Sequence, residues 1–375
     1  MRSFRMTEDL VNKTNPDKPR VAMIASGDVF GGAERQLFTL CRSGAPYFQS
    51  IIFQSLPGPL AKEAAREGIE VRKELIGQGM LSQGRTLSRA LFEEHIDIVH
   101  VHGYRGSVLA ALAAVFGSAR PVVRTVHGAP EHPASIKMQL YVHLGDISAK
   151  LCGAHSVYVS EELKGRLNVQ SSHAHTIHNG IHCEAARPGR PLEYADKPVN
   201  LAIVGRLEPV KNIACAISAL ACEETPKEAH LHIVGDGPLR SALRAQADEL
   251  GLGEKVHFHG FRSDALGFIA HADALLLPSL HEGVPYVLLE AMNLRVVPIA
   301  SKVGGIPEVA THLQDAYLLD APKAETMATA IRVIVRNVAL RAELAKNAQL
   351  RVQQAFSAET MARQYSELYR RVKRA

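Results

Sequence analysis

The sequence predicts an α/β protein with two consecutive domains, each built on a mainly parallel sheet. At 375 residues the chain is longer than a single hydrophobic core usually serves. Short apolar runs alternate with longer amphipathic segments, a pattern typical of strand–helix–strand units with right-handed crossovers. This alternation stops in AARPGRPLEYADKP (185–198), where prolines, a glycine and several charges indicate a linker, and then it resumes.

The apolar runs place the strands and the amphipathic segments place the helices. Six strands are expected in the first half and six in the second: 21–26, 50–55, 69–74, 98–103, 121–128 and 155–160, then 200–205, 230–235, 255–260, 274–279, 297–302 and 316–320. Segments such as 32–43 and 107–118 between them have helical periodicity. The last segment, 356–372, begins with a capping signal at Ser357 and should bury one face.

This pattern predicts a polar, flexible tail at 1–19, a first domain at 20–186, a linker at 187–198, a second domain at 199–355 and a closing helix at 356–375. The tail lacks the apolar centre of a signal peptide, and no window offers eighteen uninterrupted apolar residues. We therefore expect a cytoplasmic protein.

Composition excludes several classes of function. Lys and Arg number 43 against 38 for Asp and Glu, giving a net charge of +5, and no basic stripe with interleaved aromatics predicts nucleic-acid binding. The five cysteines are odd in number and have no CxxC spacing, which argues against a disulfide framework or a zinc site. The basic end, from Arg370 to Arg374, is either a solvated helix terminus or a contact with the anionic inner face of a membrane.

Ligands of open α/β sheets bind beyond the carboxyl ends of the strands, so the residues there are the candidates for a site. HEGVPYVLLEAM (281–292) follows one strand and places Glu282 in a loop and Glu290 within the helix expected at 285–293. Gly283 between them allows close backbone approach. Either glutamate taken alone would be an ordinary surface residue.

Two further strand ends suit an anion. VGRLEPVKN (204–212) places Arg206 and Lys211 on either side of a turn, and both side chains suit a phosphate or diphosphate. Gly304 and Gly305 precede another helix, whose backbone N–H groups could hold an anion. A single pair of cations is more often a solvated surface feature than a binding site.

Residues after other strands argue against several known types of nucleotide and metal site. SGDVFGGAERQ (26–36) has Gly31 and Gly32 at a helix start but lacks the GK[ST] ending of a P-loop, and HIVGDGPLR (232–240) is not a GxGxxG, which disfavours a dinucleotide oxidoreductase. There is no Asp-x-Asp that would carry a divalent cation, so we expect no metal. His127 ends a strand, where a structural and a catalytic role have about even odds.

Taken together, these motifs resemble the retaining glycosyltransferases of family four, which have the two-domain GT-B fold. The resemblance covers roughly residues 20 to 372 and rests on the order of E-x7-E, GRLEPVKN, IVGDGPLR, VHFHGF, VGGIPE and NGI. It implies transfer of a hexose or N-acetylhexosamine from a UDP- or GDP-sugar to a glycan, lipid-linked or small-molecule hydroxyl, without a metal. It also implies that the closing helix returns to the first domain.

The resemblance assigns roles residue by residue. Arg206 and Lys211 would bind the diphosphate and stabilise the leaving group, and Glu290 would bind the ribose. Glu282, with the backbone at Gly283 and Val284, would hold the transferred sugar. The resemblance also places His127 beside the donor sugar and Gly32 in the loop approaching the phosphates. Phe261 and Arg262 would lie where the base is usually held.

The sequence departs from the commonest family pattern at two positions near NGI. His178 stands where a proline is common and His182 where an aspartate is usual, which leaves the contacts on this side of the site open. A nucleotide-sugar epimerase of the same fold and a nucleotide-sugar-binding protein without turnover remain alternatives. No motif in the sequence identifies the acceptor. Residues 77–84 and 129–138 are candidate acceptor loops because of their position in the chain.

Overall fold

The structure is a computed structural model that describes the ranges 18–29, 31–128, 136–169, 171–183 and 187–374. The predicted tail at 1–19 lies almost wholly outside the described residues. Contacts between Cα atoms divide the chain into two compact units: the first comprises 1–125, 131–156 and 362–375, and the second comprises 126–130 and 157–361. The predicted boundaries follow composition and stay predictions.

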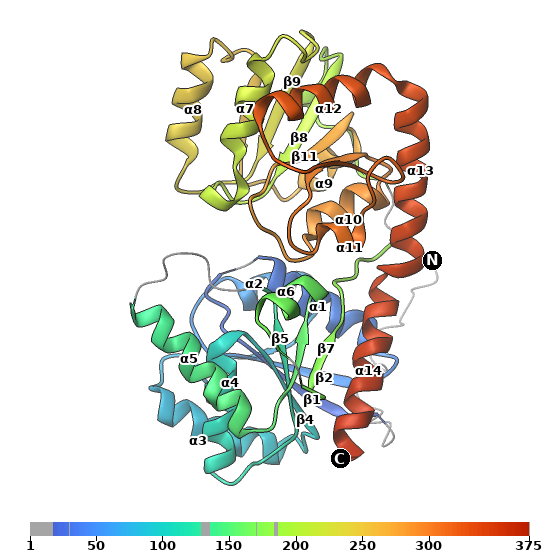
Figure 1. Cartoon of the computed structure of the whole chain (residues 1–375). Helices are drawn as coiled ribbons and strands as arrows, with labels where there is room; N and C mark the ends of the chain where they lie inside the picture. The colour runs from blue at the N-terminus through green and yellow to red at the C-terminus, as the bar shows by residue number, and fades with distance from the viewer. Residues whose placement is uncertain (1–17, 30, 129–135, 170, 184–186, 375) are drawn as a thin grey trace, which may run out of the picture. The chain divides into compact units, whose positions relative to one another are not determined.

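The first sheet has seven strands in the order β3-β2-β1-β4-β5-β6-β7 (Figure 1). Their bounds are β1 Arg20–Ala25, β2 Gln49–Gln54, β3 Val71–Arg72, β4 Ile98–His102, β5 Val122–Val126, β6 His155–Tyr158 and β7 Ala174–Thr176. The pairings β1–β2, β1–β4, β2–β3 and β4–β5 are parallel. The six expected strands are present, but β7 was missed because three residues, two of them polar, leave no apolar run to detect.

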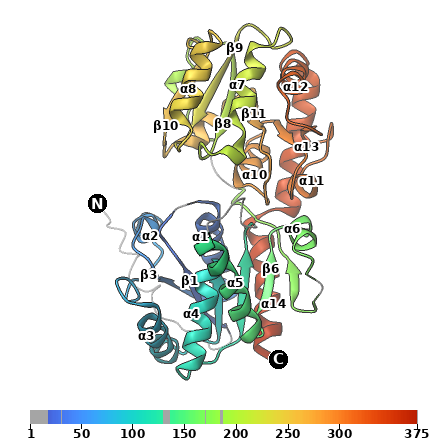
Figure 2. The same ribbon diagram turned by 60° about the vertical axis from the view of Figure 1, so that its left-hand side comes forward.

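The helices of the first half and the closing helix flank this sheet (Figure 2). Their bounds are α1 Gly32–Gly44, α2 Leu60–Arg66, α3 Met80–Glu93, α4 Gly103–Val115, α5 Ile136–Leu151, α6 Glu161–Arg166 and α14 Ala358–Arg374. Helices α3 and α4 pack their apolar faces on β1 and β4. The residues of α14 expected to be buried are buried: Met361, Tyr365, Leu368, Tyr369 and Val372.

A buried polar network ties α14 to β4 and β5 within the first unit. His100 on β4 lies 2.7 Å from the Tyr369 hydroxyl through Nδ1 and 2.7 Å from the Thr125 hydroxyl through Nε2. The Thr125 hydroxyl is in turn 2.8 Å from that of Tyr365. Each buried polar atom thereby gains a partner, which offsets the cost of removing it from water.

The second sheet has six strands in the order β10-β9-β8-β11-β12-β13, and its five neighbouring strand pairs are all parallel. Their bounds are β8 Val199–Val204, β9 Ala229–Val234, β10 Val256–Gly260, β11 Ala274–Leu277, β12 Pro298–Ser301 and β13 Tyr317–Leu319. All six were expected. Strands β8, β9 and β11 consist almost wholly of buried residues, as parallel strands covered on both faces do.

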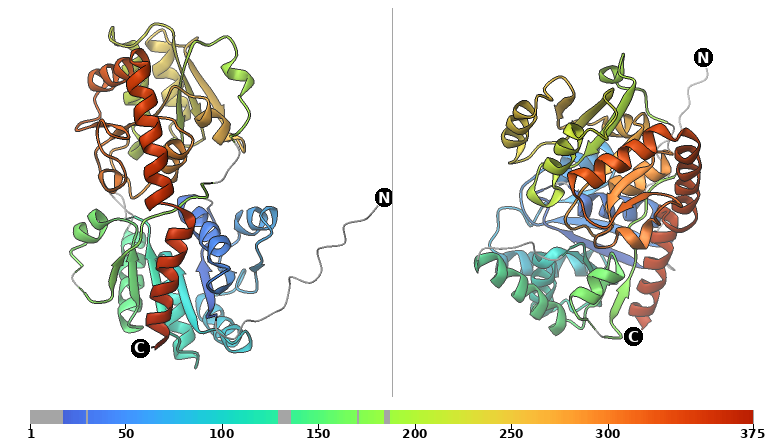
Figure 3. Two further views of the ribbon diagram at one scale, coloured as in Figure 1. Left: turned by 90° about the vertical axis from the view of Figure 1, so that its right-hand side faces the viewer. Right: turned by 45° about the horizontal axis from the view of Figure 1, so that its top comes forward.

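Helices cover both faces of the second sheet (Figure 3). Their bounds are α7 Ile213–Ala221, α8 Arg240–Glu249, α9 Ala265–Ala270, α10 Tyr286–Asn293, α11 Ile306–Val309, α12 Ala324–Arg336 and α13 Val338–Ala355, with 3₁₀ turns η1 Leu192–Tyr194 and η2 Pro209–Lys211. One core lies under α7, α8 and α12, and another lies under α10, α11 and α13. Among the described residues, no helix is long and apolar enough to cross a membrane.

Candidate active site

The loops after β8 and β9 are in direct backbone contact. The Gly205 amide donates to the Val234 carbonyl at 3.0 Å, and the Leu207 amide donates to that of Asp236 at 3.0 Å. Gly235 has φ 140°, and a Cβ there would lie 1.8 Å from the Gly205 carbonyl oxygen, so only glycine fits. The glycines of HIVGDGPLR thus allow close packing of the two loops.

Lys211 lies on a short turn that hydrogen bonds hold in place. It ends η2, and Asn212 follows in the left-handed conformation with φ 50°, where α7 starts. The Asn212 side-chain amide donates to the Pro278 carbonyl at 3.2 Å, and the Leu280 amide donates to that of Val210 at 2.8 Å. The loop after β8 is thus held against the loop after β11, because adjacent parallel strands end at the same edge of the sheet.

Glu282 is the centre of the site. Its Oε1 accepts from the Lys211 ammonium at 2.6 Å and from the Ser279 hydroxyl at 2.7 Å. The Glu282 side chain is 9% exposed and that of Lys211 is 26% exposed. Taken alone, Glu282 would be an ordinary surface residue, but it is buried here, because two donors compensate for the water that its carboxylate loses.

The glycines around Glu282 are packed against backbone. Gly304 has φ 54°, and a Cβ there would lie 1.7 Å from the Glu282 carbonyl oxygen. The Gly305 amide donates to that carbonyl at 3.2 Å, so it serves the loop and not an anion. A Cβ at Gly283 would lie 3.0 Å from the carbonyl oxygen of His127. The predicted close approach at Gly283 is thus a backbone contact with the strand end that carries His127.

Helix α10 follows Pro285 closely as expected, and its residues Leu288, Leu289 and Met292 are fully buried in the core. Val284 is also buried, and its carbonyl accepts from the Asn179 side chain at 2.7 Å. Glu290 lies in α10 and is partly buried. These contacts fix the backbone of the E-x7-E segment at both ends.

Arg206 and Lys211 differ in their surroundings. The side chain of Arg206 is 59% exposed and pairs with Glu208 at 2.6 Å. Lys211 is directed toward the buried Glu282 carboxylate instead. The two cations therefore follow β8 as expected, but one of them is solvated and the other belongs to a partly buried ion pair.

His127 follows β5 and is partly buried. Burial lowers the pKa of its imidazole to about 4. The ring is therefore neutral near pH 7, where it can donate one hydrogen bond and accept another.

Three further predicted site residues have surroundings of their own. Phe261 follows β10 and is 83% exposed. Arg262 pairs with Asp264 and with Glu193, each at 2.7 Å, and these partners raise the pKa of its guanidinium. Gly32 starts α1 in the first unit. The amide of the preceding glycine, Gly31, donates to the Glu34 carboxylate at 2.9 Å, so the chain's own anion lies at this helix start.

Two residues of this region were not predicted. Ser279 ends the run ALLLPS and was given no role, although a hydroxyl three residues before Glu282 could have been considered as its partner. Glu308 accepts from the Glu161 and Glu162 amides at 2.9 and 2.8 Å, and it lies 2.7 Å from His178 Nε2. The replacement of proline by His178 thus creates a contact with the VGGIPE segment, which spacing in the sequence does not reveal.

Two family models match the chain. Residues 30–185 match a model described as Glycosyltransferase Family 4, and residues 190–351 match one described as Glycosyl transferases group 1. The chain belongs to glycosyltransferase family 4. As a family 4 member it is a glycosyltransferase, and the resemblance inferred from the motifs is confirmed.

Two named relatives have modest sequence identity to this chain. The lipopolysaccharide core biosynthesis glycosyltransferase LpsD of Rhizobium meliloti is 33% identical over 50% of this chain and 55% of its own length. An Escherichia coli UDP-Gal:α-D-GlcNAc-diphosphoundecaprenol α-1,3-galactosyltransferase is 26% identical over 76% of this chain and 78% of its own. The chain therefore spans little more than half of LpsD.

Solved structures show the fold. The crystal structure of Anabaena HepE in complex with UDP-glucose superposes with a TM-score of 0.82 at 21% identity, covering 94% of this chain and 99% of that one. The predicted GT-B fold, with two Rossmann-like parallel-sheet domains, is thereby confirmed.

Proposed function

We propose that this family 4 member is a retaining glycosyltransferase that needs no metal and moves a hexose or N-acetylhexosamine from a UDP-sugar, or failing that a GDP-sugar, to a hydroxyl of a glycan or lipid-linked acceptor. The reaction would serve cell-surface polysaccharide or glycolipid synthesis, and the protein would then contact the inner face of the membrane. The observation that carries this is the Lys211–Glu282–Ser279 contact at the carboxyl ends of β8 and β11.

The proposed donor uses the two cations after β8 for its diphosphate. Arg206 is solvated and can turn toward a ligand, whereas Lys211 is already oriented by Glu282. Negative charge grows on the diphosphate as the sugar leaves. Cations held near the diphosphate lower the activation barrier of this step. The UDP complexes of the fold relative HepE and the UDP-Gal donor in the name of the E. coli relative favour uridine.

In the proposed reaction, the bond between the anomeric carbon and the β-phosphate oxygen breaks, and a bond to the acceptor oxygen forms on the same face. The acceptor proton passes to the departing phosphate oxygen, which leaves a nucleoside diphosphate and a glycoside. Glu282 would hold sugar hydroxyls, Glu290 the ribose, and the neutral His127 would bond the sugar without adding charge. Phe261 and Arg262 would lie at the base, and Gly32 near the phosphates.

A thermal-shift panel of UDP- and GDP-sugars in EDTA tests the donor, since a ligand of the native state raises the melting temperature. We expect stabilisation by one UDP-sugar that is lost in Lys211→Ala and kept in Lys227→Ala, an exposed lysine of the same unit. Product analysis with an acceptor then separates transfer from epimerisation and from binding without turnover. Stabilisation only when a divalent cation is added would contradict the metal-independent part of the proposal.

A further inference from the structure

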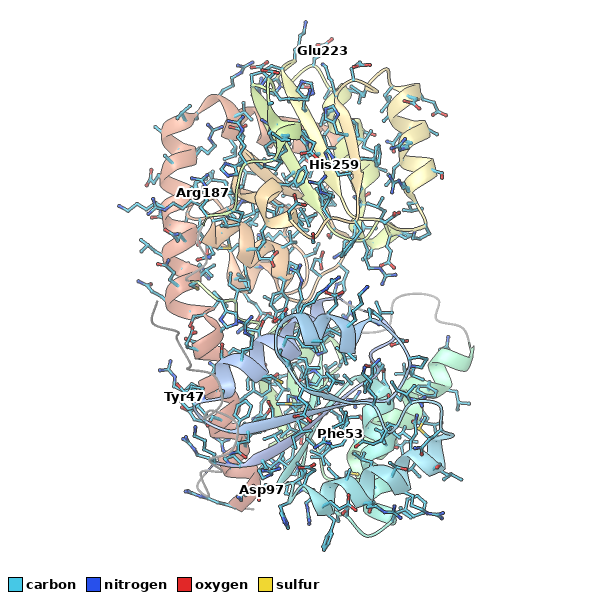
Figure 4. The ribbon with its side chains drawn as sticks, turned by 180° about the vertical axis from the view of Figure 1, so that it is seen from behind. Tyr47, Phe53, Asp97, Arg187, Glu223 and His259 are labelled. Carbon is cyan, nitrogen blue, oxygen red and sulfur yellow. The ribbon has the colours of Figure 1, made fainter. Side chains whose placement is uncertain are left out.

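A strongly basic pocket lies at the amino ends of the strands of the second sheet, whereas the candidate active site lies at their carboxyl ends. It has a volume of about 440 Å³ and is lined by linker residues, by the turns before β8, β11 and β12, and by the start of α13. Its charged residues are Arg187, Arg190, Lys197, Asp273, Arg295 and Arg341. Figure 4 labels Arg187 among these side chains.

The cations of this pocket outnumber its carboxylates. In the described ranges, only Arg341 has a carboxylate partner there, because it pairs with Asp273 at 2.9 Å. The second oxygen of Asp273 accepts from the Asn200 amide at 2.9 Å, so this carboxylate is already used on both sides. Five cations thus face one anion, and like charges gathered in a cleft raise the local concentration of anions.

The remaining arginines are oriented by neutral acceptors. Arg187 donates to the Ala270 carbonyl at 2.6 Å, Arg190 to the Tyr194 carbonyl at 3.2 Å and Arg295 to the Gln349 side chain at 2.7 Å. These bonds hold the guanidinium groups in place without cancelling their charge. A guanidinium has five N–H donors in a planar fork, so the groups keep donors that match a phosphate.

Two observations support a role beyond packing. Arg295 has φ 59°, a left-handed conformation that favours glycine or asparagine, so its long side chain is kept at a backbone cost. The charge of the pocket also acts on β10 of the same sheet: burial and then the Lys197 charge lower the pKa of His257 to about 4.

We propose that this pocket binds a small molecule carrying phosphate groups, separately from the donor site. Its volume lies in the range of small-molecule sites, and its charge suits a polyvalent anion. The pocket precedes β8, whereas Arg206 and Lys211 follow it; a six-residue strand spans about 20 Å at 3.3 Å per residue. One diphosphate cannot reach both places.

Calorimetry with inorganic pyrophosphate tests the pocket in the full chain at low salt. The background variant Arg206→Ala/Lys211→Ala removes the proposed donor cations, so the binding that remains reports the pocket. We expect that adding Arg187→Gln and Arg190→Gln weakens this binding about tenfold or more, since each charge-assisted bond is worth about that factor. Adding Arg332→Gln, an exposed arginine of α12 outside the pocket, should leave it unchanged.

Absence of pyrophosphate binding in the background variant, or binding unaffected by the linker substitutions, would overturn the proposal. Arg295→Gln is a second variant, outside the linker, and should also weaken binding; in the native protein this side chain donates to Gln349 of α13. Because the background already lacks the donor cations, failure of the proposed transferase reaction and failure of this pocket are separate results.

Discussion

The Lys211 ammonium lies 2.6 Å from Oε1 of Glu282, and this ion pair joins the loop after β8 to the loop after β11. The two residues are far apart in the chain but lie at adjacent strand ends. The lysine thereby satisfies the buried carboxylate. A diphosphate binding near Lys211 would share or replace that partner, which links donor binding to the conformation of the Glu282 loop.

The pairing predicts a coupling in stability. Lys211→Met and Glu282→Gln should each destabilise the protein, and the double variant should cost about 1–3 kcal/mol less than the sum, since removing one partner leaves the other charge uncompensated. Urea unfolding of the four proteins measures this. Additive costs would show that the pair contributes nothing to the fold.

Transfer should depend on the same lysine. We expect Lys211→Ala to lower kcat/KM about 10²–10³-fold, because a cation at developing charge acts mainly in the transition state. Steady-state kinetics with the donor found by thermal shift gives the value, with Lys227→Ala as the matched control. A normal rate in Lys211→Ala would remove Lys211 from the site.

Gly304→Ala should be poorly tolerated because its Cβ would lie 1.7 Å from the Glu282 carbonyl oxygen. Gly251→Ala is the comparison: Gly251 also has positive φ, 68°, but a Cβ there meets nothing within 4 Å. We expect the second variant to lose about 1–2 kcal/mol from its backbone conformation, and the first about 2–4 kcal/mol more from the clash. Equal losses in chemical unfolding would mean that the two loops separate easily.

Acid should destabilise the second unit through histidines on β9 and β10. His232 Nδ1 lies 3.1 Å from His259 Nε2, and His230 pairs in the same way with His257 (Figure 4 labels His259). Burial lowers the pKa of His232 to about 2 and that of His257 to about 4. The positive charges of Lys197 and Lys255 also lower pKa values among these histidines. At His259, Arg262 lowers the pKa, whereas Glu193 and Asp264 raise it.

The sign follows from proton binding. Unfolded histidines take up protons near pH 6.5, whereas the folded ones resist until lower pH, so stability falls as pH drops below about 6.5. Each fully buried histidine such as His232 contributes up to about 1.4 kcal/mol per pH unit. We expect the loss in urea midpoint between pH 7.5 and 5.0 to shrink in His232→Gln but not in His182→Gln, an exposed histidine. The same loss in both variants would contradict this.

Glu308 should protect the start of α6. Its carboxylate accepts from the Glu161 and Glu162 amides, so Glu308→Ala should raise their hydrogen-exchange rates about tenfold or more. Glu325→Ala, at the start of α12, is a control that should not alter these amides. Unchanged exchange in Glu308→Ala would show that the backbone amides find other partners.

The sequence alone determined the class of fold and the places where chemistry gathers. The hydrophobic periodicity and the turn residues predict twelve of the strands. They also place Arg206, Lys211 and Glu282 just after strands, because local sequence decides where a strand must stop. The three-residue β7 carried no such signal.

Only the tertiary structure decided which side chains meet. Lys211 meets Glu282, Glu308 bonds His178, and the linker arginines gather with Arg295 and Arg341, each through residues distant in the chain. Such contacts depend on which strands are neighbours and how their loops pack. Strand order is set by burial over the whole sheet, and no local pattern in the sequence records it.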